Sequence, residues 1–198
     1  MQSKDHYLLG CFLLEHLPLQ LDPLRKHLFL FGCIEPDVNP FTYARGSMKY
    51  QFLHGHNAEN AKKHLDHAIK KLLDHGVHTP MQWFAFGTAL HYIADSFTFP
   101  HNDLFSGDLI EHRNYEKLLH TEFEKYLGEW HTTTALSANT AQSFAWFHTQ
   151  YLSDTRSFLT DCQYIVNASF GLCETLHIGV ALPDQIHALE MQNSYGKI

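Results

Sequence analysis

Histidine and carboxylate side chains occur at helical spacing in the middle of this chain. His91 and Asp95 are four residues apart within an apolar run, so a helix would place both on one face. His101 follows, and then His112 and Glu116 repeat the four-residue spacing. A carboxylate buried without a partner is strongly destabilising, and nitrogen and oxygen donors grouped in this way suit zinc. The sequence therefore predicts a metal site built from these five residues.

Each pair taken alone has a simpler explanation. A histidine and a carboxylate at this spacing often form a local hydrogen bond or a solvated surface pair. The combination favours a metal because the first pair interrupts the most apolar helix in the sequence. That helix is predicted to open at Thr79 and Pro80 as cap and first position, and to run through the middle of the domain. Its apolar residues are Trp83, Phe84, Phe86, Ala89, Leu90, Ile93, Ala94 and Phe97.

Two helices are predicted ahead of this one. Residues 5–17 read as an amphipathic helix, and a second begins with Asp22 as cap and Pro23 in the first position and runs to about Gly32. The two prolines of CIEPDVNP then predict an extended, irregular loop that holds Asp37 rigidly. A simple turn-capping role is the alternative for this aspartate.

The remaining segments also have the helical period. One helix, capped by Asn57 or Asn60, is predicted to end at Gly76, and its histidines are expected to be exposed or capping. These are His64, His67, His75 and His78. The helical period continues from about Tyr115 to Leu127, before Gly128, and two further helices are expected over about 137–153 and about 155–177, while the tail after Pro183 is ambiguous. No convincing alternating strand is found, so the predicted fold class is all-α, a helical bundle.

Composition limits the function classes. The 198 residues suffice for one domain, 1–198, and no linker-like segment divides them. Fourteen Lys and Arg against twenty-one Asp and Glu give a net charge of −7, which disfavours a broad nucleic-acid-binding surface.

The cysteines and the N-terminal segment indicate the cellular compartment in which the protein is expected. The four cysteines have no CxxC spacing and lie in apolar contexts, so they are predicted to be buried thiols. No signal peptide and no membrane span is recognised. We therefore expect a cytoplasmic protein.

The order of these motifs resembles a known family. The chain has a histidine near its N-terminus, a Pro-Asp after a helix, a histidine before the next helix, then LHYIADSFTFPH and HRNYE. This series resembles the bacterial zinc-dependent phospholipase C family over about residues 5–125. The same ligand set is shared by the single-strand-specific zinc nucleases of fungi and plants. The resemblance implies a single helical domain with two to three zinc ions.

The resemblance also implies a role for each candidate residue. A water would lie between the first and third ions, and Asp37 would act as general base as well as ligand. Bound zinc lowers the pKa of water from about 15.7 towards about 7, which suits phosphodiester hydrolysis. The implied ligands are Asp37, His56, His91 and Asp95 for a first zinc, His101, His112 and Glu116 for a second, and His6 with the bridging Asp95 for a third; His54 is the alternative to His56.

The N-terminus departs from the family pattern. In secreted members the first residue chelates the third zinc through its own amine and carbonyl, whereas here five residues precede His6. Three alternatives remain open. The amine of Met1 folds back, Asp5 or water substitutes for it, or the third site is weak or empty.

Three functions follow in order of preference. The first is a phospholipase C-like hydrolase acting on a phospholipid head group or similar phosphodiester, with peripheral membrane contact and no stable nucleic-acid complex. The second is a single-strand nuclease or other small-molecule phosphodiesterase, which the acidic composition disfavours. The third is a non-catalytic metal-binding helical protein, which Asp37 and the open, dispersed ligand set disfavour. The head group and the oligomeric state are not predicted.

Overall fold

The helix α5 (Pro80–Ser96) lies in the middle of the molecule, as predicted. The computed structural model describes residues 1–39, 58–102, 104–130 and 144–179. The side chain of Thr79 accepts a hydrogen bond from the Gln82 backbone at 3.3 Å, and the Gln82 side chain accepts one from the Thr79 backbone at 2.7 Å. This reciprocal cap and the proline at the first position explain where the helix begins.

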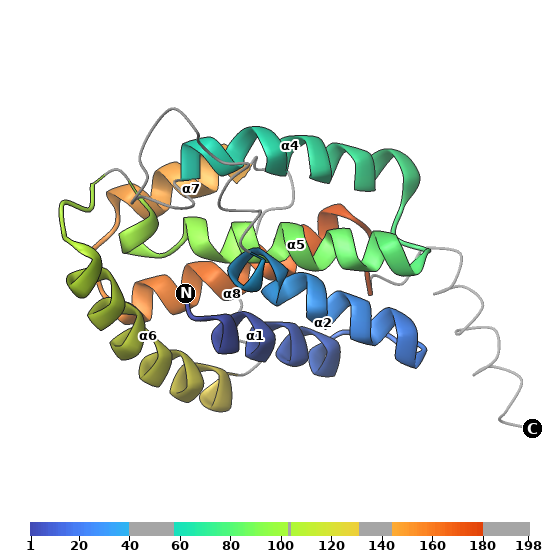
Figure 1. Cartoon of the computed structure of the whole chain (residues 1–198), viewed down its shortest axis with the longest axis horizontal. Coiled ribbons are helices and arrows are strands. Elements are labelled where there is room, and N and C mark those ends of the chain that lie inside the picture. The colour runs from blue at the N-terminus through green and yellow to red at the C-terminus, as the bar shows by residue number, and fades with distance from the viewer. Residues whose placement is uncertain (40–57, 103, 131–143, 180–198) are drawn as a thin grey trace, which may run out of the picture.

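The other helices surround α5. Figure 1 shows α4 (Ala58–His75) along one side, α1 (Ser3–His16) and α2 (Pro23–Val38) along the other, and α6 (Leu109–Glu129) crossing at one end. The bundle is completed by α7 (Phe144–Ser153), α8 (Phe158–Thr175) and the short 3₁₀ helix η1 (Phe99–His101). All regular structure in the described ranges is helical, so the all-α prediction is confirmed.

Two glycines bring α2 and α5 unusually close together. A Cβ atom on Gly32 would lie 2.2 Å from the backbone oxygen of Phe84, and one on Gly87 would lie 2.2 Å from that of Phe29. Any larger residue would push the backbones apart. Beside this contact the rings of Phe29 and Phe86 stack at 5.1 Å. The glycines therefore set the spacing between the helix that carries Asp37 and the helix that carries the first histidine–aspartate pair.

The predicted end of α2 was wrong. The helix continues past Gly32 to Val38, so Asp37 projects from its last turn and not from an extended loop. Pro36 is buried within that turn, and the Asn39 backbone donates to the Glu35 oxygen at 2.9 Å to close it. A proline lacks the backbone N–H of one helical hydrogen bond, and here the helix ends only two residues after it.

Most other boundaries agree with the sequence. Asp22 caps α2, and α4 ends before Gly76, which has a φ of 70°. The helix predicted over 155–177 is α8, and α7 is the described part of the one predicted over 137–153. The beginning of that helix and the tail after Pro183 lie outside the described residues.

All four cysteines are free thiols; Cys33, Cys162 and Cys173 are buried, and Cys11 is half-buried. Within the described ranges no helix is both long and apolar enough to cross a membrane.

Candidate metal centre

A first cluster of metal-ligating side chains lies at the buried junction of α1 and α5. Nε2 of His6 is 3.2 Å from Oδ1 of Asp95, and Nε2 of His91 is 3.3 Å from Oδ2 of the same carboxylate. The two imidazole rings stack with their centroids 3.7 Å apart. All three side chains are buried, and their donor atoms lie close enough to share an ion. Two histidines from different helices therefore converge on a single carboxylate.

Asp37 extends this cluster from the end of α2. Its Oδ1 is 3.6 Å from Nε2 of His91. Nδ1 of His91 donates to the Cys33 backbone oxygen at 2.8 Å, because a carbonyl can only accept. That hydrogen bond orients the ring so that Nε2 faces the two carboxylates, which is the usual arrangement behind a metal-ligating histidine. Burial acts to lower the pKa of His91, but the Asp95 and Asp37 carboxylates and the Cys33 carbonyl together outweigh it and raise that pKa.

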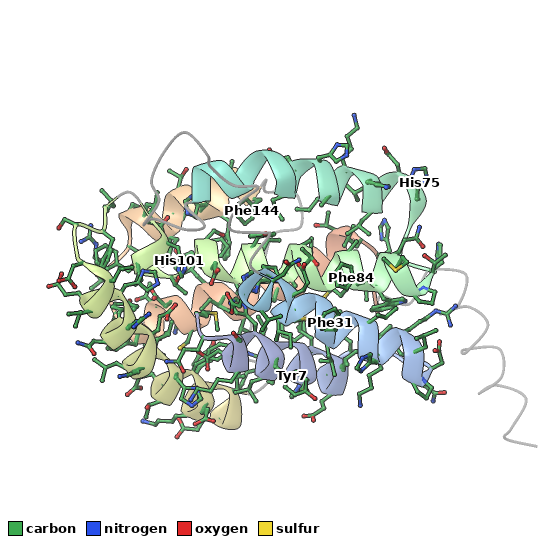
Figure 2. The ribbon with its side chains drawn as sticks, viewed as in Figure 1. Tyr7, Phe31, His75, Phe84, His101 and Phe144 are labelled. Carbon is green, nitrogen blue, oxygen red and sulfur yellow. The ribbon has the colours of Figure 1, made fainter. Side chains whose placement is uncertain are left out.

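The second cluster lies where α6 crosses the end of α5. Nε2 of His112 is 3.2 Å from Oε1 of Glu116, and the rings of His101 and His112 meet edge to face at 4.9 Å. These three residues also lie close enough to share an ion. Nε2 of His101 is 3.8 Å from Oδ2 of Asp95, so this carboxylate connects the two clusters. Figure 2 shows His101 at this end of the molecule.

Thr98 determines which nitrogen of His101 is available. Its hydroxyl donates to the backbone oxygen of Asp95 at 2.7 Å, and its oxygen lies 2.6 Å from Nδ1 of His101. A hydroxyl has one hydrogen, so Nδ1 must be the donor in the second contact. Nε2 is then left with its lone pair towards Asp95 and α6. Thr98 was not predicted from the sequence, although it lies only three residues before His101.

The N-terminal amine lies between the two clusters. The amine of Met1 is 2.6 Å from Oδ1 of Asp95 and 3.3 Å from Oε1 of Glu116, and it is fully buried. Burial lowers its pKa, but the carboxylates of Asp95 and Glu116 reverse this and raise the pKa to about 10. Among the alternatives for the N-terminus, the structure therefore has the amine folded back. Asp5 points elsewhere, towards His120.

Several buried atoms lack the partners that a protein interior normally supplies. Within the described part of the chain, both ring nitrogens of His6 and Oδ2 of Asp37 make no well-aligned hydrogen bond. Orphaned polar atoms of this kind are costly unless an ion or water satisfies them. Burial also lowers the pKa of His6 to about 4 and that of His101 to about 3, so both imidazoles are neutral near pH 7. Neutral imidazole is the metal-ligating form, so His6 and His101 are already in the form that binds zinc, and the orphaned atoms beside the carboxylates fit such an ion.

The remaining histidine candidates from the sequence are not part of these clusters as described, and the side chain of His64 is outside the described part of the chain. His54 and His56 fall outside the described residues. His67, His75 and His78 are exposed, as expected. Figure 2 shows His75 at the opposite end of the molecule from His101.

The fold and the site together define a class: an all-α protein in which carboxylates and histidines from several helices surround one buried aspartate. The family model for zinc-dependent phospholipase C matches residues 5–165. The chain belongs to this family of zinc-dependent hydrolases. The match extends well past residue 125, where the resemblance in sequence motifs ended. The searches of curated proteins and of solved structures found no significant match.

Proposed function

We propose that this protein hydrolyses phosphodiesters with zinc and that its substrate is a phospholipid. In a phospholipase C-like reaction, water attacks phosphorus, the bond to the glycerol oxygen breaks, and that oxygen leaves with a proton. The observation that carries the proposal is the position of Asp95, which lies between His6 and His91 on one side and approaches His101 on the other. A shared carboxylate between two donor clusters suits ions that act together on one phosphate.

The proposed ligands combine the two clusters with the N-terminus. Bound zinc would supply an acidified water and would neutralise charge on the phosphodiester. His56 stays a prediction from the sequence. The first ion would be held by Asp37, His56, His91 and Asp95, the second by His101, His112 and Glu116, and the third by His6, Asp95 and the Met1 amine.

Asp37 is the proposed general base. Its carboxylate lies at the edge of the first cluster, with the side chain 17 % exposed. One oxygen approaches His91, and the other has no hydrogen-bond partner among the described residues. A carboxylate that is close to the donors and keeps one oxygen uncommitted is placed to accept a proton from water.

A substrate panel tests the proposed function. The panel comprises a chromogenic phosphocholine ester, phospholipid vesicles, a bis-aryl phosphate and single-stranded nucleic acid, each assayed with zinc bound. We expect the lipid-like esters to be cleaved fastest, because the chain is acidic and disfavours a polyanionic strand. Faster cleavage of nucleic acid would move the protein to the nuclease class. Inactivity on the whole panel would favour a non-catalytic metal protein.

The variant Asp37→Asn tests the proposed base. The amide keeps the shape of the side chain but cannot accept a proton, so we expect kcat to fall by at least about 10²-fold. Zinc content is measured in parallel, because Asp37 is also a proposed ligand. Undiminished turnover would place the base on another residue.

The proposed compartment is the cytoplasm. Four free thiols, three of them fully buried, are compatible with a reducing environment. Fractionation of cells that express the full chain tests this, and recovery outside the cytoplasmic fraction would contradict it.

A further inference from the structure

A second histidine–glutamate pair follows the metal-centre pair along α6, with its histidine half-buried and its glutamate exposed. His120 and Glu124 follow Glu116 at the same four-residue spacing, so they lie on the same side of the helix. Nε2 of His120 is 3.5 Å from a carboxylate oxygen of Glu124. Its Nδ1 instead meets Oδ1 of Asp5, in α1, at 2.5 Å. Neither His120 nor Asp5 belongs to a possible metal-holding group within the described residues.

Asp5 is fully buried although it is a carboxylate. It is adjacent to His6, and consecutive residues of a helix point about 100° apart. His6 therefore faces Asp95 while Asp5 faces α6. A buried carboxylate needs a hydrogen-bond donor, and the imidazole of His120 supplies it across 115 positions of sequence.

Asp5 also holds the residues in front of α1. Its Oδ2 accepts a hydrogen bond from the Gln2 backbone at 3.1 Å, while its own backbone donates to the Gln2 oxygen at 2.8 Å. These two contacts close the first turn and determine the direction in which the chain enters the helix. The Met1 amine, one residue before Gln2, donates to Oδ1 of Asp95 at 2.6 Å.

We infer that His120 is a positioning residue: by holding Asp5, it fixes the first turn of α1 so that the Met1 amine and the His6 imidazole meet at Asp95. The same face of α6 thus holds Glu116 beside the amine and, one turn later, the histidine that orients the amine's own helix. The effect of His120 on zinc binding rests on the proposed zinc site. Its effect on the burial of the Met1 amine does not, and can be tested without zinc.

The first test measures the rate at which an acylating reagent modifies the Met1 amine, with the full chain and mass spectrometry as the readout. The wild-type amine should react more slowly than the exposed lysines Lys26 and Lys70. In His120→Ala the rate should rise by at least about tenfold, which is the scale set by losing one charge-assisted hydrogen bond. The matched control is His27→Ala, since His27 is an exposed histidine on α2, and it should leave the rate unchanged.

Two amide variants keep the test decisive if His120→Ala fails to fold. The side-chain nitrogen of an asparagine reaches approximately the position of Nδ1, whereas that of a glutamine reaches the position of Nε2. His120→Asn should therefore retain the slow reaction of the amine and His120→Gln should lose it. Equal rates in these two variants, or a wild-type rate in His120→Ala, would overturn the inference.

The second test measures zinc binding by titration with a chelator. His120→Ala should weaken the ion at His6 and the amine by about 10- to 100-fold, as is typical when a residue behind a ligand is removed. The ion held by His101, His112 and Glu116 should keep its wild-type affinity. If no zinc binds to the wild type, the proposed function fails, while amine reactivity still decides the role of His120. If zinc binds and both ions keep their affinity in His120→Ala, the positioning role is wrong.

Discussion

At the scale of single residues, Asp161 supports the second cluster without belonging to it. It is 2 % exposed, and its carboxylate accepts hydrogen bonds from the hydroxyls of Tyr115 and Tyr151, both at 2.8 Å. The Phe99 backbone donates to it as well, at 3.4 Å. Tyr115 directly precedes Glu116, and Phe99 lies in the same 3₁₀ helix as His101. One carboxylate in α8 thus holds both elements that carry the second cluster.

Asp161 should titrate well above the usual range of an aspartate. Burial raises its pKa to about 6, with the two tyrosines limiting the rise. Because the folded-state pKa exceeds the unfolded value of 3.8, the folded chain binds the proton more tightly. The stability contributed by this group is therefore fully present below about pH 4 and is lost as the pH rises through about 6. The size of the effect is roughly 2–3 kcal/mol.

The measurement compares urea unfolding of the wild type and Asp161→Asn at several pH values and one zinc concentration. The unfolding free energy of the wild type relative to the variant should fall between about pH 4 and 6 and level off above. Asparagine does not titrate, and all other titratable groups are the same in both proteins. The pH dependence of the difference in unfolding free energy therefore comes from Asp161. A difference that stays constant with pH would mean that Asp161 keeps an ordinary pKa.

At the scale of elements, the close packing of α2 against α5 positions the first cluster. Asp37 ends α2, while His91 and Asp95 lie on α5. The hydrogen bond from His91 to the Cys33 oxygen crosses the same interface. A change in the separation of these helices would therefore move Asp37 away from the donors on α5.

Gly87→Ala tests this interface. The added methyl group would lie 2.2 Å from the Phe29 oxygen, so the helices must separate. We expect a loss of roughly 1–3 kcal/mol in unfolding free energy and weaker zinc binding at the first cluster. The matched control is Gly171→Ala in α8, where nothing lies within 4 Å of the new atom. It should be neutral or stabilising by up to about 1 kcal/mol. Equal effects of the two variants would contradict the proposed role of the contact.

At the scale of the whole molecule, the bundle buries an unusual number of ionisable groups. His6, His91 and Asp95 lie together in the interior with the Met1 amine. When no ion is bound, the positive charge of the Met1 amine is the one that lies nearest to the negative charge of the Asp95 carboxylate. Ions bound only in the folded state would add their binding free energy to folding stability.

Removal of zinc should therefore lower the melting temperature. An ion present at 100 times its Kd contributes about 2.7 kcal/mol, and in a chain of this size each 1 kcal/mol corresponds to roughly 2–4 °C. We expect a decrease of at least about 5 °C when a chelator removes one such ion. Thermal unfolding with and without chelator, with zinc counted by elemental analysis, measures it. An unchanged melting temperature after confirmed zinc loss would show that the protein itself satisfies the buried groups.

The sequence by itself determined the features that depend on local spacing. The helical period predicted the all-α fold and the central place of α5, and four-residue spacing placed the donor pairs of α5 and α6 on single faces. The caps at Asp22 and Thr79 were predicted for the same reason, because a cap acts within one turn. The family motifs correctly indicated the zinc-dependent phospholipase C family.

Only the tertiary structure decided how these local features meet. The sequence left three alternatives for the N-terminus, and helix packing brings the amine of Met1 to Asp95, 94 positions away. His120 was missed because its partner, Asp5, is 115 positions away, although its spacing from Glu116 was visible. The end of α2 was also mispredicted, because the two prolines were expected to end the helix early, whereas Pro36 lies buried within its last turn. Helical periodicity is a property of neighbouring residues, whereas contacts between distant residues depend on how closely whole helices approach, here through Gly32 and Gly87.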